Sequence, residues 1–313
     1  MPAICGAVPA PPVPGATQFV CNADGTRLDR FVADRSGAHT RRRTAAIIAA
    51  GAVRVNGRPA RKGQLLQRGD VVEIDPAALI ETPLVAQADL ALPILYEDAA
   101  LIAVDKPSGM PAAALRGEDV GTVANFLLAY APDTLTAGGS PLEAGLVHRL
   151  DTGTSGVLLA ARTAAAWADV REQFRRRQVE KRYLAWVDGD VARAGTRREP
   201  IAHHPRRPQA MRVCPDAEQA RALRARPALT RYRPLERRGG ATLLAIEIST
   251  GVRHQIRVHL AAAGHPVRGD TVYGGSAAPR LMLHAAGLGV RHPVSGRRLS
   301  IDSPPPRDFS VPA

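Results

Sequence analysis

The chain has 313 residues, with 42 Lys and Arg against 29 Asp and Glu and a formal net charge of +13. This length accommodates two domains, and so large a positive excess makes a polyanion such as nucleic acid the first partner to consider. No stretch of about 18 apolar residues occurs, so we expect no membrane-spanning helix.

The first residues and the cysteines indicate where the protein works. Residues 1–16 are rich in Pro and Ala and lack a basic start followed by an apolar stretch, which predicts a disordered tail rather than a secretion signal. The three cysteines, Cys5, Cys21 and Cys214, are odd in number and widely spaced. This pattern argues against a disulfide framework and a zinc site, and it fits a cytoplasmic protein.

Residues 17–76 predict a small module of two helices and a small sheet. Residues 26–29, Thr-Arg-Leu-Asp, are typical of a capping box that opens a helix, and a second helix is expected from about residue 41 to 50. Residues 53–57 alternate Val with polar residues and end in Asn-Gly, a strong hairpin signal. Residues 71–74 indicate a last strand.

This module carries basic residues at its helix start and turns, which favours RNA binding over a solvated basic face. The order of elements, and above all Gly51-x-Val53-x-Val55-Asn56-Gly57, resembles the alpha-L RNA-binding domain of ribosomal proteins and RNA-modifying enzymes. The residues of the module that we expect to bind RNA are Arg41, Arg42, Arg43, Arg54, Arg58, Arg61 and Lys62.

Residues 77–90 lack clear periodicity and predict a linker to a larger domain over residues 91–313. Strands are expected at 101–104, 157–160, 183–187, 242–248, 281–283 and 299–301, and helices at 122–130, 163–177 and 255–263. Residues 190–228 are rich in Arg and Pro and predict an exposed insert. Helices and strands mix without regular βαβ alternation, which favours an α+β fold on a mostly antiparallel sheet.

Positive charge concentrates in one part of the larger domain. Residues 171–238 hold 19 Lys and Arg and 8 Asp and Glu, a net +11 in less than a quarter of the chain. Clustered charge is a better sign of nucleic-acid binding than total charge. We therefore favour a nucleic-acid surface over a generally basic exterior.

The most informative segment is Gly-Leu-Val-His-Arg-Leu-Asp-Thr-Gly-Thr-Ser-Gly at residues 145–156. A short apolar strand, Leu146-Val147, is expected to lead to one carboxylate, Asp151, in a loop where small residues let a ligand approach the backbone. Taken alone, an Asp before Thr-Gly is more often a turn former that caps its own backbone. Other segments of the chain favour the functional interpretation.

The segment resembles the signature His-Arg-Leu-Asp-x-x-Thr-Ser-Gly of the RluA-like family of RNA pseudouridine synthases and matches each fixed position. Further resemblances follow in the family's order and extend over most of residues 95–290: Asp105-Lys106-Pro107-Ser108-Gly109, Lys181-Arg182-Tyr183-Leu184-Ala185, residues 250–259, residues 264–274, and Leu283-His284-Ala285. We interpret Lys-Pro-Ser-Gly as a largely structural turn.

The resemblance implies the pseudouridine synthase fold and an enzyme that isomerises uridine in RNA to pseudouridine without cofactor, metal or energy source. Large-subunit ribosomal RNA is the expected substrate, because the added N-terminal module suits a large structured RNA; transfer RNA is the alternative. Two other classes stay open. One is a non-catalytic RNA-binding or ribosome-assembly protein with the same fold, and the other is an unrelated hydrolase that uses His and Ser.

The resemblance also assigns the catalytic residues Asp151, Tyr183 and Arg257. One carboxylate can stabilise a ribose that loses its base, by attack on the anomeric carbon or by assisting base loss. A guanidinium stays charged and grips a carboxylate, which favours Arg257 as the partner of Asp151 over a surface arginine that contacts phosphate. Tyr183 is expected to stack on the uracil or to take part in proton transfer, rather than to serve only in the core.

Because a base inside a helix is inaccessible, the target nucleotide is expected to flip into the pocket. The residues expected to bind it are His148, Arg149, Thr154, Lys181, His254 and Gln255. In this hypothesis His148 and Arg149 hold the flipped nucleotide or fill its place. In the alternative they support the loop.

Spacing argues against two other chemistries. Ser155 is not in a nucleophile elbow, because Val157 stands where the second glycine is needed. His254 and His259 are five residues apart, so they do not share a helix face as zinc ligands at i and i+4 do, and we expect no metal. Nothing in the sequence requires more than a monomer.

The chain departs from the family in two places. Val252 stands where many relatives carry Arg, and Arg253 is expected to take over its phosphate contact. After Gly109 the chain reads Met-Pro-Ala-Ala-Ala, without the apolar-His stretch common in the family. Both departures bear on substrate choice, and neither involves the three catalytic residues.

Overall fold

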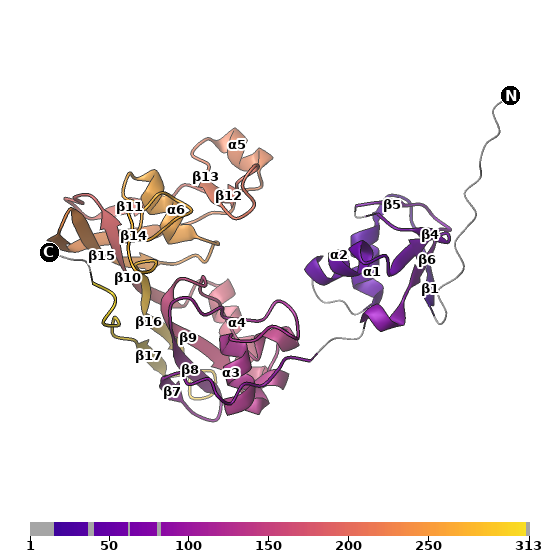
Figure 1. Cartoon of the computed structure of the whole chain (residues 1–313), viewed down its shortest axis with the longest axis horizontal. Helices are drawn as coiled ribbons and strands as arrows, with labels where there is room; N and C mark the ends of the chain where they lie inside the picture. Colours follow the sequence, from indigo (N-terminus) through magenta and orange to yellow (C-terminus); the bar gives the residue numbers. More distant parts are fainter. Residues whose placement is uncertain (1–15, 37–40, 62, 80–82, 311–313) are drawn as a thin grey trace. The chain divides into compact units, whose positions relative to one another are not determined.

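The structure is a computed structural model that describes residues 16–36, 41–61, 63–79 and 83–310 (Figure 1), with backbone only at Ser36 and Arg41 to Arg43. The chain divides into two compact units, residues 1–82 and 83–313. The expected tail lies outside the described residues except for Ala16. No helix in the described ranges is long and apolar enough to cross a membrane.

The smaller unit contains two helices and a four-stranded antiparallel sheet. The helices are α1 (Leu28–Ser36) and α2 (Arg41–Ala49), and the sheet has the order β1 (Thr17–Val20), β6 (Val71–Ile74), β3 (Val53–Val55), β4 (Arg58–Pro59). A separate ladder joins β2 (Thr26–Arg27) to β5 (Leu65–Leu66), and a short 3-10 helix, η1 (Pro76–Leu79), follows the sheet. Apolar faces of helices and sheet meet in one core that includes Leu28, Val32, Ile48, Val53 and Val72.

The Asn-Gly turn between β3 and β4 forms as predicted. Asn56 and Gly57 have φ of 51° and 73°, the two positive values that a type I′ turn requires. The predicted capping box at residues 26–29 is wrong. Thr26 lies in the short strand β2, its hydroxyl donates to the carbonyl of Ala23 at 3.2 Å, and α1 begins only at Leu28.

The larger unit is built on a nine-stranded sheet whose pairs are antiparallel except for β9 with β16. This confirms the predicted α+β class with a mostly antiparallel sheet. The strands in spatial order are β11 (Gly195–Arg197), β14 (Thr230–Arg238), β15 (Ala241–Ile248), β10 (Glu180–Asp188), β16 (Leu283–Arg291), β9 (Ser155–Ala161), β8 (Leu101–Lys106) and β7 (Ile94–Glu97), with β17 (Arg298–Asp302) paired to β16. The strand expected at 281–283 is wrong in extent, because β16 begins only at Leu283 and continues to Arg291.

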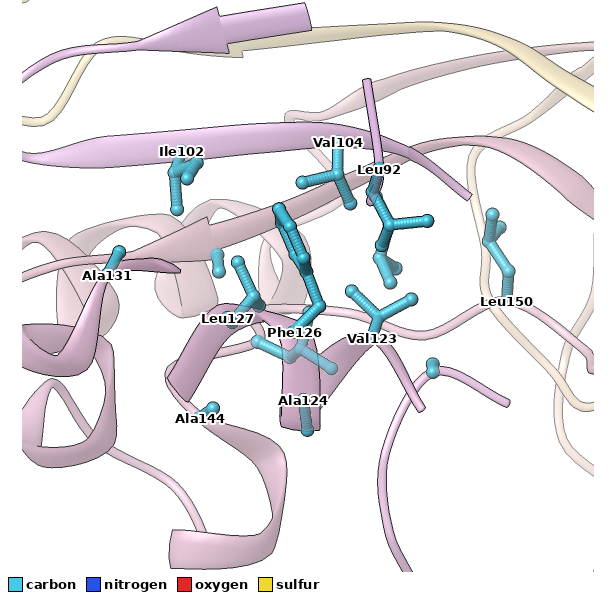
Figure 2. Close-up of a cluster of buried hydrophobic side chains, with 14 of the residues drawn as sticks. Leu92, Ile102, Val104, Val123, Ala124, Phe126, Leu127, Ala131, Ala144 and Leu150 are labelled. Carbon is cyan, nitrogen blue, oxygen red and sulfur yellow. The ribbon is translucent and has the colours of Figure 1, made fainter. Parts of the chain in front are cut away.

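The main helices of this unit are α3 (Val123–Tyr130), α4 (Ala164–Arg175) and α6 (Gln255–Ala262), with 3-10 turns η2 (Pro132–Thr136) and η3 (Pro141–Glu143). Threonines begin α3 and α4: the Thr122 hydroxyl accepts from the backbone N–H of Asn125, and Thr163 caps α4 in the same way. Figure 2 shows Ile102 and Val104 of β8 facing Phe126 and Leu127 of α3 in one apolar cluster. This packing holds α3 against β8 and β9, the two strands whose ends carry the loops described below.

The segment before β9 differs from expectation. Leu146-Val147 is not a regular strand: Leu146 makes one isolated bridge with Ala160, and the N–H of Val147 donates to the carbonyl of Leu159. Ala144 and Gly145, with φ of 43° and 70°, turn the chain directly before it. This change of direction prevents the extended pairing that the two apolar residues indicated.

Part of the segment expected to be a linker packs on the larger unit. Leu84 is buried in the cluster around α3. The side-chain amide of Asn125 donates to the carbonyl of Val85, and the backbone carbonyl of Asn125 accepts the N–H of Gln87. Residues 83–90 therefore belong structurally to the larger unit.

The insert at residues 190–228 is only partly exposed, which corrects the expectation. It contributes β11 to the main sheet, then forms a hairpin of β12 (Ile201–His203) and β13 (Met211–Val213) followed by α5 (Ala217–Ala222). Ile201 and Met211 are buried in a cluster with Val258 of α6. The hairpin is thereby fixed to the helix that carries Arg257.

Candidate active site

Asp151 lies in the loop before β9, and the turn after β8 holds the backbone of this loop. The carbonyl of Asp151 accepts from the N–H of Thr154 at 3.0 Å. The next two carbonyls accept from the N–H of Gly109 at 2.9 Å and from the hydroxyl of Ser108 at 2.6 Å. Each carbonyl of residues 151–153 therefore accepts a hydrogen bond. These bonds fix the loop of Asp151 between the end of β8 and the start of β9.

Lys106, at the end of β8, completes this clamp. Its side chain is fully buried, and its ammonium donates to the carbonyls of Pro107 at 2.9 Å, Met110 at 2.7 Å and Thr152 at 3.0 Å. Burial, aided by the positive charge of Arg280, lowers the pKa of Lys106 to about 7. The lysine joins the turn after β8 to the loop of Asp151.

Arg257, on α6, contacts two carboxylates at once. Its Nη1 donates to Oδ2 of Asp151 at 3.1 Å. Its Nε and Nη2 donate to Asp270 at 2.6 and 2.8 Å. Burial opposes the charge of Arg257, but the hydrogen bond and charge of Asp270, with the charge of Asp151, outweigh it and raise the pKa of the guanidinium. The arginine therefore stays charged beside Asp151.

Tyr183 lies half-buried on β10, where the pairing with β16 is irregular. Arg182 and Leu184 of β10 pair with Gly287 and His284, so β16 contains an extra residue opposite Tyr183. Such bulges re-aim side chains and are frequent beside active sites. Burial and the negative charge of Asp151 raise the pKa of the phenol, so it remains protonated at neutral pH.

A cavity of about 920 Å³ opens onto Asp151, Tyr183 and Arg257. The described residues that line it include more basic than acidic side chains: Arg149, Arg171, Arg175, Lys181, Arg226, Arg253 and Arg257, against Asp151 and Glu172. The predicted trio of acid, phenol and guanidinium is therefore present in one basic cavity.

Comparison with known proteins identifies this arrangement. Residues 100–262 match the family model described as RNA pseudouridylate synthase, and residues 26–72 match the S4 domain. The chain belongs to the RNA pseudouridylate synthase family. It is 39% identical to an uncharacterized RNA pseudouridine synthase of Chloroflexus aurantiacus over 91% of this chain and 88% of that protein. It is 34% identical to the ribosomal large subunit pseudouridine synthase D of Pseudomonas aeruginosa, over 91% and 90%.

A solved structure is similar as well. Human RNA pseudouridylate synthase domain containing 1 aligns with a TM-score of 0.55 and 27% identity, covering 69% of this chain and 84% of that one. The predicted resemblance to RluA-like RNA pseudouridine synthases, the fold and the enzyme class are confirmed. The N-terminal module predicted to resemble the alpha-L domain lies in the region that matches S4.

Lys181 and His148 form one cluster in the wall of this pseudouridine synthase cavity. Lys181 donates to the carbonyl of Thr250 at 2.7 Å, and burial lowers its pKa to about 8. His148 stacks on Phe174, with ring centroids 5.0 Å apart, and its Nε2 accepts the N–H of Leu159 at 3.1 Å. Burial, with the nearby cations, lowers the pKa of His148 to about 3. These contacts match the alternative in which His148 supports the loop.

Gln255 and Thr154 also have protein partners. The Gln255 side-chain oxygen accepts from the hydroxyl of Thr250 and the N–H of Val252, and its nitrogen donates to the carbonyl of Leu229. These bonds shape the loop before α6, although both Gln255 and Thr154 line the cavity. Thr154 is buried and closes the turn of Asp151.

Arg149 lies close to solvent, and His254 lies close to Asp151. Arg149 is exposed, and within the described chain it has no acidic partner. His254 is the N-cap residue of α6, and its Nε2 lies 3.9 Å from Oδ2 of Asp151. Both are therefore placed to meet a ligand in the cavity.

The structure adds site residues that sequence reasoning did not assign. Asp270 holds Arg257, Tyr273 contacts His254, and Arg226 lines the cavity from the insert. The first two lie in Gly-Asp-x-x-Tyr at residues 269–273, a segment that the resemblance had included without a role. For Arg226 the sequence offered no indication of a site residue beyond the excess of arginine in residues 171–238.

The basic residues expected to bind RNA in the S4 unit are only partly within the described chain. Arg58 and Arg61 are exposed, and Arg54 lies half-buried on β3. The side chains of Arg41 to Arg43, and Lys62 as a whole, lie outside the described residues. In the described ranges no group of three or more His, Cys, Asp or Glu gathers as metal ligands would.

Proposed function

We propose that this chain converts specific uridines of large-subunit ribosomal RNA into pseudouridine, with Asp151 as the catalytic carboxylate. The observation that carries the proposal is the 3.1 Å contact between Asp151 and Arg257 within a basic cavity that also presents Tyr183. The substrate class follows from relatives named ribosomal large subunit pseudouridine synthase D, which align over about nine-tenths of this chain.

The chemistry asks three things of the protein. The bond between C1′ of the ribose and N1 of uracil breaks, a bond between C1′ and C5 forms, and N1 gains the proton that C5 loses, so no atoms enter or leave. Asp151 stabilises the ribose while the base is detached, by attack at C1′ or by assisting base loss. Arg257 holds and orients the carboxylate through its 3.1 Å contact, and Tyr183 offers a ring and a protonated hydroxyl to the uracil.

The cavity supports entry of a flipped nucleotide. A target base inside a helix is inaccessible, so it must leave the stack to reach Asp151. Arg149 and Arg226 line the cavity and have no acidic partner in the described chain, which leaves their charges for the phosphates on either side of the flipped nucleotide. We assign Lys181, His254, Thr154 and Gln255 to the wall against which the nucleotide rests.

The S4 unit adds a second RNA contact. Exposed Arg58 and Arg61 lie beside the hairpin turn of that unit and supply sequence-independent affinity through phosphate contacts. Because the proposed substrate is ribosomal RNA, we expect the enzyme to work in the cytoplasm. The groups of the proposed site all come from one chain, so we expect a monomer to be active.

Mapping pseudouridine across all cellular RNA tests the proposal, in a strain without this protein and in strains restored with wild type or with Asp151→Asn. We expect one or more large-subunit ribosomal sites to lose pseudouridine and to regain it only with wild type. Loss of sites confined to transfer RNA would overturn the substrate. No lost site, together with no product from the purified enzyme on ribosomal RNA, would favour a binding protein.

A further inference from the structure

Tyr273 connects the insert to the groups that flank Asp151. Its hydroxyl accepts the backbone N–H of Met211 at 2.7 Å and lies 3.0 Å from Nδ1 of His254. Its ring lies 5.3 Å from the guanidinium carbon of Arg257 and meets the His254 ring edge-on, with centroids 5.7 Å apart. One side chain thus touches both the arginine and the histidine beside the catalytic carboxylate.

These contacts set where the protons lie. The N–H of Met211 can only donate, so the oxygen of Tyr273 accepts there and its own proton is available to another acceptor. Within the described chain, the other partner recorded for this hydroxyl is Nδ1 of His254, which can accept that proton. A neutral imidazole whose Nδ1 accepts carries its hydrogen on Nε2. That Nε2 is the atom 3.9 Å from Oδ2 of Asp151.

His254 is neutral under ordinary conditions. Burial and the nearby charges of Arg257 and Arg253 lower its pKa to about 4, although Asp151 acts in the opposite direction. The distance of 3.9 Å to Asp151 is longer than a hydrogen bond, so the Nε2–H is free to donate to an oxygen that enters the cavity.

The backbone of His254 points independently to a functional position. Its φ of 55° and ψ of 19° lie in the left-handed region, which is uncommon for residues other than glycine. Such strain persists where surrounding contacts impose it, and it is concentrated at functional sites. Here Gln255 fixes the preceding loop through Val252, and Tyr273 fixes the ring itself.

We propose that Tyr273 is a positioning residue of the reaction: it holds His254 with the hydrogen on Nε2, so that this N–H is presented beside Asp151 to an oxygen of the flipped nucleotide. The proposal rests on the proposed function, because it assigns the donor to the same cavity. The β12–β13 hairpin takes part through Met211, and Arg253 binds its turn at the carbonyls of Pro208 and Gln209.

The first test is Tyr273→Phe in the full chain, which removes the hydroxyl and keeps the ring. We expect kcat on ribosomal RNA to fall on the order of ten- to hundredfold while KM changes less than about twofold, because a donor aligned for the reacting groups is lost. Nitrogen-15 NMR should show His254 with hydrogen on Nε2 in wild type and a shift toward the other tautomer in the variant. Tyr232→Phe, a half-buried tyrosine of β14 whose hydroxyl has no recorded partner in the described chain, is the matched control and should change neither readout.

A second pair of variants keeps the proposal testable if Tyr273→Phe folds poorly. In His254→Gln the amide nitrogen reaches the place of Nε2, and in His254→Asn it reaches the place of Nδ1. The left-handed backbone favours Asn, so stability alone would rank the pair the other way. We expect kcat to be several times higher with Gln than with Asn.

Three results would overturn the proposal: wild-type His254 with its hydrogen on Nδ1, an unchanged kcat in folded Tyr273→Phe, or Asn equal to Gln at position 254. The tautomer is measured without substrate, so it can be decided even if the wild-type enzyme fails to modify ribosomal RNA. That failure would count against the proposed function instead.

Discussion

Arg257 and Asp270 form a two-bond fork, with Nε to Oδ2 at 2.6 Å and Nη2 to Oδ1 at 2.8 Å. The fork fixes the plane of the guanidinium and leaves Nη1 for Asp151. The side chain of Asp270 is fully buried, whereas that of Asp151 is 25% exposed toward the cavity. Two identical carboxylates therefore lie in different surroundings: Asp270 is buried against the arginine, and Asp151 faces the cavity, where we propose that it meets the substrate.

Asp151→Asn should abolish activity while the enzyme still binds RNA. The amide has the size of the carboxylate but neither its charge nor its nucleophilicity, so we expect kcat to fall by at least about a thousandfold. Pseudouridine formation and RNA affinity, measured on the same RNA, separate the two effects. Asp190→Asn, at an exposed position, is the control. Residual activity near wild type in Asp151→Asn would remove Asp151 from the mechanism.

Asp270→Asn should damage stability as well as activity. It leaves the buried Arg257 without its main counter-charge, and breaking a buried ion pair typically costs about 3–5 kcal/mol. Urea unfolding should therefore show a large loss in the free energy of unfolding, in contrast to Asp151→Asn at the more exposed position. Equal stability of the two variants would show that the fork does not support the fold.

Stability should fall as the pH drops below neutral, in part through His148. Its pKa is about 3 in the folded state against 6.5 as the ordinary value, so below pH 6.5 the unfolded chain takes up a proton that the folded chain does not. His148→Gln keeps an acceptor for the N–H of Leu159 without titrating. At pH 5 this removes about 2 kcal/mol of the acid destabilisation, measurable by urea unfolding at pH 7 and pH 5.

The exposed His203 supplies the control for that measurement. His203→Gln should leave the difference between the two pH values unchanged. If His148→Gln also leaves it unchanged, the burial of His148 does not affect the acid stability of the protein.

Gly156→Ala should destabilise the sheet at its one parallel pair. A Cβ at this position overlaps the carbonyl oxygen of Ala285 on β16, and the φ of 110° is one that residues other than glycine adopt only with strain. We expect a loss of about 3 kcal/mol or more in thermal or urea unfolding. Gly296→Ala, at a φ of 70° in open space, should cost only about 1 kcal/mol. Similar losses at both positions would contradict the close approach of β9 and β16.

Replacing Arg58 and Arg61 of the S4 unit by Ser should weaken RNA binding without changing kcat. Each phosphate contact adds about 0.7 to 0.9 to the slope of log affinity against log salt, so the slope should fall by about 1 to 2. Kd measured over a range of salt concentrations decides this. The exposed Arg297, replaced in the same way, should leave the slope unaltered. An unchanged slope in the double variant would place the RNA elsewhere.

The sequence by itself determined several local elements and the residue types that the site presents. The Asn56-Gly57 turn formed because only a few residue types tolerate two positive φ values, and the caps at Thr122 and Thr163 formed because a hydroxyl satisfies a free helix N–H. Asp151, Tyr183 and Arg257 were assigned by resemblance, and the fold places all three at one cavity.

Only the tertiary structure decided which carboxylate is buried against Arg257 and which lines the cavity. Asp151 and Arg257 are 106 residues apart, and their contact depends on how α6 packs beside the loop before β9. Burial distinguishes Asp270 from Asp151, and it surrounds His148, whose ring accepts the N–H of Leu159. Burial is a property of packed surfaces rather than of neighbours along the chain, so no local pattern of residues could encode it.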